Sequence, residues 1–180
     1  MKKFLLSLAT LALAATTAMA DEVTFDFATN DYGLTRQSET NAPYIASGTQ
    51  VTSGDISITL NKAKGNGWRL WSDGLRVYKN SDASMVISAN GGNITNVEAT
   101  FKSGVITAYS LNGGAPVSVS GGKFSATTAS ENVNLALTVP SNGAVYTVKV
   151  TYEPAAGDKE HAGLQFSETS CTAVLGQAFT

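Results

Sequence analysis

The most informative stretch of this chain is Gly67-Trp68-Arg69-Leu70-Trp71-Ser72-Asp73-Gly74-Leu75-Arg76-Val77-Tyr78-Lys79. Two runs of strand-forming residues flank the pair Asp73-Gly74, which suits the positive φ angles of a type I′ turn. The stretch therefore predicts a β-hairpin whose two turn residues are Asp73 and Gly74. A three-residue turn that includes Ser72 would mix charged and apolar side chains on both faces.

The predicted register sorts the hairpin side chains, because successive residues of a strand point to opposite sides of a sheet. It sets Trp71 opposite Arg76 and Arg69 opposite Tyr78. One face is apolar and is expected to join the core: Trp68, Leu70, Leu75 and Val77. The other face carries two guanidinium groups beside two rings: Arg69, Trp71, Arg76 and Tyr78. These four are the candidate ligand-binding residues, since rings stack on sugars and arginines donate paired hydrogen bonds to oxygens.

Two alternatives stay open for this second face. Its pairs of arginine and aromatic side chains stabilise the sheet by about 0.5–1 kcal/mol each and touch no ligand. In the second alternative the two faces of the hairpin are exchanged, so that Trp71 is buried and Trp68 is exposed.

The rest of the chain alternates apolar and polar residues in the same way, with no helical period after residue 20. Clear strands are expected at 23–27, 56–60, 84–89, 94–101, 133–139 and 145–152, and weaker ones at 105–111, 115–119 and around residue 124. That makes about nine or ten strands, at the spacing typical of sandwiches. The predicted fold class is all-β: two antiparallel sheets packed as a jelly-roll-like β-sandwich, with the last strand central in its sheet.

Between Thr29 and Thr52 the alternation is lost and turn residues predominate. A connection of this length is uncommon in a compact domain and often belongs to a binding surface. Its candidate contact residues are Tyr32, Arg36 and Tyr44. The alternative is that the two tyrosines pin the loop to the sandwich.

The first twenty residues have the features of a secretory signal peptide. Lys2 and Lys3 precede an apolar stretch too short for a membrane span, and Ala18-Met19-Ala20 provides a cleavage site. We therefore expect a signal peptide at 1–20, no transmembrane segment, and a secreted, extracellular or cell-surface protein. Without the two lysines, 10 basic residues face 14 acidic ones, so nucleic acid is not an expected partner.

The remaining chain divides into three parts. Residues 21–153 are long enough for one sandwich domain, and 154–162 have the small and charged composition of a linker. Residues 163–180 begin a new strand-like run that is too short to fold alone, so we expect the incomplete start of a second domain.

Residues suited to catalysis are sparse. The single histidine, His161, lies in the linker and the single cysteine, Cys171, lies near the end, which excludes Ser-His and Cys-His pairs within 21–153. A carboxylate pair for glycoside hydrolysis stays formally open, from Asp26, Asp55, Asp73, Glu98 and Glu153. Most of these acids fall in turns or on outward faces, so we expect no enzyme and no cofactor. A structural calcium ion in the oxygen-rich loops 29–31 and 80–82 is an alternative to ordinary turn chemistry.

Two parts of the chain resemble known sequence families. Asp73-Gly74-Leu75-Arg76-Val77-Tyr78-Lys79, with residues 85–89 and 91–101, resembles the centre of β-sandwich modules in secreted multi-domain proteins of Gram-negative bacteria. Gly163-Leu164-Gln165-Phe166-Ser167 and the residues up to Thr180 resemble the first strands of bacterial immunoglobulin-like (Big-type) repeats. The resemblance implies a jelly-roll or galactose-binding-like module with downstream domains in the same polypeptide. It supplies no site residues.

The expected function is non-catalytic binding at or outside the cell surface, with a glycan or cell-surface polymer as the partner. Two other functions remain open: a structural spacer or adhesin segment without a small ligand, and an accessory domain of a secreted hydrolase.

Overall fold

The computed structural model describes residues 20–38 and 43–154, whose regular structure consists of strands. In chain order these are β1 (Asp21–Asp26), β2 (Thr49–Ser53), β3 (Ile56–Lys62), β4 (Trp68–Trp71), β5 (Gly74–Val77), β6 (Ala83–Ala89), β7 (Gly92–Phe101), β8 (Ala108–Leu111), β9 (Val117–Ser118), β10 (Lys123–Ser130), β11 (Asn132–Thr138) and β12 (Gly143–Pro154). Within those residues, no helix has the length and apolarity needed to cross a bilayer. Nearly all of the predicted signal peptide and linker, and all of 163–180, lie outside the described residues.

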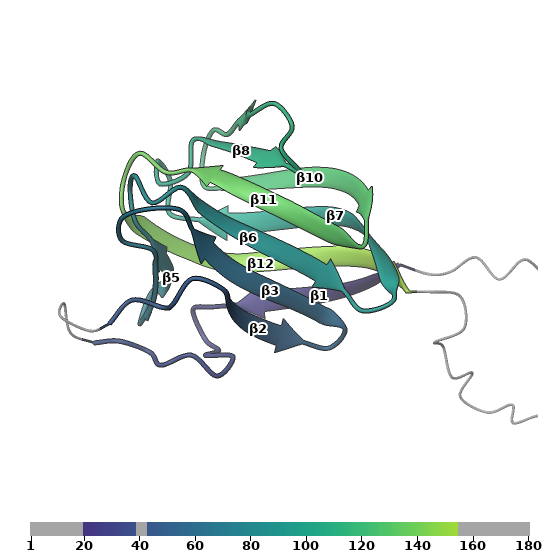
Figure 1. The fold of residues 1–180 in the computed structure, drawn as a ribbon, viewed down its shortest axis with the longest axis horizontal. Coiled ribbons are helices and arrows are strands. Elements are labelled where there is room, and N and C mark those ends of the chain that lie inside the picture. The colour runs from purple at the N-terminus through teal and green to yellow at the C-terminus, as the bar shows by residue number, and fades with distance from the viewer. Residues whose placement is uncertain (1–19, 39–42, 155–180) are drawn as a thin grey trace, which may run out of the picture.

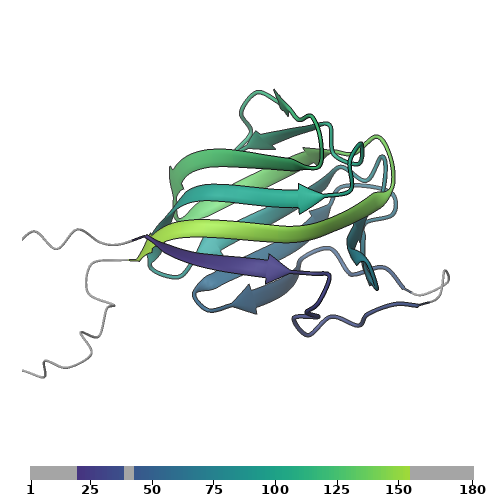
Figure 2. The same ribbon diagram turned by 180° about the vertical axis from the view of Figure 1, so that it is seen from behind.

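The strands form two antiparallel sheets of six strands each. Sheet 1 has the order β10-β7-β12-β5-β4, with β1 also paired to β12, and sheet 2 has the order β2-β3-β6-β11-β8-β9. The sheets lie face to face, and the chain passes repeatedly from one to the other (Figures 1 and 2). The predicted all-β, two-sheet antiparallel sandwich is confirmed.

Strand β12 lies at the centre of sheet 1, as the sequence predicts. One of its edges pairs with β7 along almost its whole length. Its other edge pairs first with β5, at Gly143 to Val145, and then with β1, at Thr147 to Tyr152. The β4–β5 hairpin therefore extends sheet 1 at one end of the sandwich, while the strand ends at Asp21 and Pro154 lie at the other (Figure 1).

Apolar side chains from both sheets meet in one core. Met85 and Leu135 of sheet 2 and Ala99 and Val148 of sheet 1 line the same small interior space. Full burial of a large apolar side chain stabilises the fold by about 1.5–3 kcal/mol. Most of the inward positions predicted from the alternation are buried, including Phe25, Phe27, Ile56, Ile58, Leu60, Ile87, Val97, Phe101, Val133 and Val150. Val23 and Tyr146, which the alternation also places inward, are half-buried.

The predicted turn of the hairpin is wrong by one position. Trp71 pairs with Gly74, so the turn residues are Ser72 and Asp73, and neither has a positive φ. Gly74 has a φ of +131°, and a Cβ there would lie 2.7 Å from the carbonyl oxygen of Val145 on β12. The glycine is therefore required by its positive φ and by its close approach to β12, although it is not one of the two turn residues.

The number of strands also differs from the prediction. Strand β2 lies almost wholly inside the stretch expected to be irregular. Val51 is its one buried side chain and gives too short a pattern to recognise. The weak strand expected around Phe124 is the eight-residue β10, which pairs with β7. Its serine, threonine and alanine residues carry little hydrophobic signal, so sheet pairing and not side-chain pattern defines it.

Candidate functional site

The side chains of the β4–β5 hairpin divide between two faces as predicted. The apolar face is buried in the core, with exposed fractions of no more than 1%: Trp68, Leu70, Leu75 and Val77. This excludes the inverted hairpin. The corrected register shifts the pairing by two residues, and a shift of two leaves every side chain on its original face.

The opposite face carries the four candidate binding residues, joined by one ring from the preceding loop. We call this surface the hairpin face: Tyr44, Arg69, Trp71, Arg76 and Tyr78. Arg69 and Arg76 are direct cross-strand partners, an arrangement that is unfavourable for like charges. Each guanidinium group turns to a different ring, which separates the hairpin face into two halves.

The Arg69 half is packed around a buried guanidinium group. The guanidinium carbon of Arg69 lies 3.7 Å from the ring centroid of Tyr44 and 5.8 Å from that of Tyr78. The two rings meet edge to face at 5.2 Å. Arg69 is 8% exposed, so in this structure it supports the two rings and is not available as a contact for a ligand.

The Arg76 half is open. The guanidinium carbon of Arg76 lies 4.7 Å from the ring centroid of Trp71, and the Arg76 side chain is 38% exposed. Its acidic partner is Asp73 in the turn, at 3.4 Å. Trp71 Nε1 and Arg76 Nε are buried and have no hydrogen-bond partner in the described structure. A partly exposed ring and a partly exposed guanidinium group therefore lie together, and each carries one buried donor without a partner.

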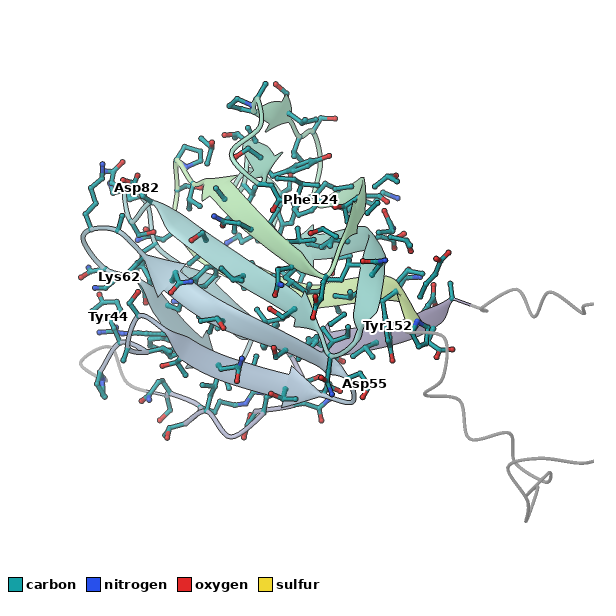
Figure 3. The ribbon with its side chains drawn as sticks, turned by 45° about the vertical axis from the view of Figure 1, so that its right-hand side comes forward. Tyr44, Asp55, Lys62, Asp82, Phe124 and Tyr152 are labelled. Carbon is teal, nitrogen blue, oxygen red and sulfur yellow. The ribbon has the colours of Figure 1, made fainter. Side chains whose placement is uncertain are left out.

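The long connection after β1 runs along the outer edge of β4. The amide of Gln37 donates to the Leu70 carbonyl at 2.7 Å, and the amide of Ile45 donates to the Trp68 carbonyl at 2.8 Å. These bridges occupy backbone groups of an edge strand that would otherwise be free to pair with another chain. The same path brings the ring of Tyr44 against Arg69 on the hairpin face. Tyr44 lies at the end of the sandwich that also carries Lys62 and Asp82 (Figure 3).

Arg36 fixes this connection to the sandwich. Its guanidinium group donates hydrogen bonds to the backbone carbonyls of Phe27, Asn30 and Trp71. It also forms an ion pair of 2.7 Å with Asp31. Arg36 is one of the three predicted contact residues, and its donors are used in hydrogen bonds to backbone carbonyls.

Tyr32 also packs against the sandwich and does not point to solvent as a contact residue would. Its ring packs on Phe25 and Phe27 with centroid distances of 5.2 and 5.5 Å. Its hydroxyl oxygen accepts a hydrogen bond of 2.8 Å from the amide of Asp26. The interpretation in which tyrosines pin the loop to the sandwich is confirmed for Tyr32 and, through Arg69, for Tyr44.

The two loops considered for calcium use their carboxylates in ion pairs. Asp31 pairs with Arg36 at 2.7 Å, and Asp82 pairs with Lys64 at 2.8 Å. Within residues 20–38 and 43–154, no group of three or more His, Cys, Asp or Glu side chains is placed to hold a metal ion.

Several carboxylates considered for hydrolysis also have local partners. Asp26 accepts hydrogen bonds from the hydroxyl and amide of Thr29 and from the amide of Ala28, and these bonds hold the pKa of Asp26 below its ordinary value. Asp55 accepts a hydrogen bond of 3.1 Å from the hydroxyl of Tyr152 at the far end of the sandwich (Figure 3). These contacts give the two carboxylates structural roles.

Apart from the hairpin face, a hollow lies on sheet 1, where β7 pairs with β10. It has a volume of about 350 Å³ and is lined by Glu98, Ala99, Thr100, Lys123, Phe124 and Ser125. Phe124 is its one aromatic side chain and is 8% exposed, so the hollow offers no open ring on which a sugar can stack. The hairpin face remains the stronger candidate.

No protein-family model, no curated protein and no solved structure matches this chain.

Proposed function

We propose that this chain is a secreted or surface-attached, non-catalytic binding module that holds a carbohydrate on the open half of its hairpin face. The observation that carries the proposal is the pairing of Trp71 with Arg76, a partly exposed ring beside a partly exposed guanidinium group. Aromatic rings contribute a large apolar surface to a sugar, and arginine contributes several hydrogen-bond donors in a fixed plane.

The rigidity of this surface supports the proposal. The backbone of β4 is held by β5 on one edge and by the bridges from Gln37 and Ile45 on the other. Arg69 holds the rings of Tyr44 and Tyr78 next to it. A surface that is already ordered loses less conformational entropy when a ligand binds.

The position of the surface also supports a module within a longer protein. The hairpin lies at the end of the sandwich opposite Asp21 and Pro154, where the described chain begins and ends (Figure 2). A ligand on the hairpin face would therefore be clear of anything joined to those ends. This arrangement suits the module of a multi-domain bacterial surface protein that the sequence resemblance implies, with a jelly-roll or galactose-binding-like sandwich ahead of an immunoglobulin-like repeat.

The proposal is tested on a glycan array with residues 21–180 and three variants. Trp71→Ala and Arg76→Ala are expected to abolish the array signal. Lys123→Ala is the matched control, because this exposed residue lies in the hollow between β7 and β10 and its loss should change nothing. Silence of the unaltered chain on the array would contradict carbohydrate binding and favour the structural spacer. Loss of binding in Lys123→Ala alone would show that the carbohydrate binds in the hollow between β7 and β10 and not on the hairpin face.

A further inference from the structure

The hairpin and its flanks are positively charged, although the whole chain has a net charge of −2. Residues 61–79 contain one acidic side chain, Asp73, and five basic ones: Lys62, Lys64, Arg69, Arg76 and Lys79. Lys64 is neutralised by Asp82 in an exposed ion pair of 2.8 Å, and Arg69 is buried. The end of the sandwich that carries the hairpin face therefore keeps a local excess of positive charge, which favours an anionic ligand.

The acidic partner of Arg76 is weakly held. The distance from Arg76 Nη2 to Asp73 Oδ2 is 3.4 Å, and the two side chains are 38% and 47% exposed. Exposed ion pairs of this kind contribute little to stability. A carboxylate on a ligand can therefore replace Asp73 at little cost, and it can accept two parallel hydrogen bonds from the guanidinium group.

The side chains of Trp71 and Arg76 each have one N–H donor without a hydrogen-bond partner. Trp71 Nε1 and Arg76 Nε are both N–H groups without a partner in the described structure, and the guanidinium carbon is 4.7 Å from the tryptophan ring centroid. Buried donors that lack an acceptor are unfavourable, so an acceptor that reaches them gains more than an ordinary surface hydrogen bond. Both groups donate, and an ionised carboxylate is a sugar substituent that only accepts hydrogen bonds and whose two oxygens match the paired donors of a guanidinium group.

We propose that the saccharide bound by the hairpin face carries a carboxylate, as a uronic acid does, and that Arg76 and Trp71 Nε1 bind this group in place of Asp73. This inference rests on the proposed function, because it names the class of carbohydrate for the same site. Arg76 supplies charge and geometry, and Trp71 supplies one more donor. Asp73 is the competitor that the ligand displaces.

The test compares uronic acid polymers with the same polymers after reduction of their carboxyl groups to alcohols. Binding of residues 21–180 to polygalacturonate, alginate and hyaluronate is measured by affinity electrophoresis, each beside its reduced form. We expect binding to at least one acidic polymer, at least a tenfold loss on reduction, and weakening as salt is raised. Equal affinity for acidic and reduced polymers would overturn the inference and leave carbohydrate binding intact. Binding to neutral glycans alone would also overturn the carboxylate inference and leave carbohydrate binding intact. Binding to no polymer would overturn both the inference and the proposed function.

Three variants assign the roles of the residues. Arg76→Ala should weaken binding to the acidic polymer about tenfold or more, since a charge-assisted pair is lost. Trp71→Phe keeps a ring and removes the Nε1 donor, and a loss of several-fold is expected. Asp73→Asn removes the competing carboxylate and should raise affinity for the acidic polymer several-fold without changing affinity for the reduced one. Weaker binding of Asp73→Asn to the acidic polymer, with an unchanged circular dichroism spectrum, would contradict the exchange.

Discussion

The ring of Tyr44 lies 3.7 Å from the guanidinium carbon of Arg69, which joins the long connection after β1 to the outer face of β4. The neighbouring arginine, Arg76, lies directly opposite Arg69 yet stays partly exposed beside Trp71. One arginine of the pair is therefore buried between two rings, and the other is partly exposed at the surface.

This difference predicts effects of different size on stability for two similar substitutions. Arg69→Ala removes a buried side chain packed between two rings and should lower the free energy of unfolding by about 1–3 kcal/mol. Arg76→Ala removes a partly exposed side chain and should change the free energy of unfolding by less than about 0.5 kcal/mol. Urea denaturation measures both values. Equal losses for the two variants would show that the halves of the hairpin face are not distinct.

The attachment of the long connection depends on Arg36. Arg36→Ala removes three hydrogen bonds to backbone carbonyls and an ion pair, and should cost about 2 kcal/mol. Hydrogen exchange should then accelerate at the amides of Gln37 and Ile45, which bond to β4. The amide of Gly48, which bonds to Leu60 on β3, is the internal control and should keep its protection. Unchanged exchange at Gln37 would show that the bridges hold the connection without Arg36.

The glycine at the start of β5 should not tolerate a side chain. Gly74→Ala combines an unfavourable φ of +131° with a methyl group 2.7 Å from the carbonyl oxygen of Val145, and should cost about 2–4 kcal/mol. Gly33→Ala is the matched control, because Gly33 also has a positive φ, +78°, but has open space around it. It should cost about 1 kcal/mol. Thermal denaturation of the two variants separates the effect of crowding from that of backbone strain.

The bond between Tyr152 and Asp55 predicts a dependence of stability on alkaline pH. Burial, and next the hydrogen bond to Asp55, raise the pKa of Tyr152 above its ordinary value of 10.0. A group whose pKa is raised by folding stabilises the folded state below its unfolded pKa, and this contribution is lost as pH rises through the folded pKa. The free energy of unfolding should therefore fall more steeply above pH 10 in the unaltered chain than in Tyr152→Phe.

The same variant has a second expected effect at neutral pH. Loss of the hydroxyl should cost about 1 kcal/mol, because a hydrogen bond between β12 and the turn before β3 is removed. Denaturation at pH 7 and at a series of alkaline values gives both results. Parallel pH curves for the two proteins would contradict the role of Tyr152.

The division of hairpin side chains between core and surface follows from the sequence, and so does the arrangement of the strands in two antiparallel sheets. Side chains in a strand alternate, so the burial of Trp68 and Leu70 and the outward position of Arg69 depend only on the order of residues. The error in the turn did not change this prediction. The pairing was shifted by two residues, and a shift of two leaves every side chain on the same face. The sequence therefore predicts that the four candidate residues share the face opposite the core, and the structure places them there.

Other features needed contacts between distant parts of the chain. The sequence shows a glycine at position 74, but only the approach of β12 shows why it is there, since a turn and a close contact both call for glycine. Likewise, two arginines on one face look alike in sequence. The tertiary structure brings Tyr44 over one of them and leaves the other open, because burial depends on what crosses a surface and not on the strand that presents it.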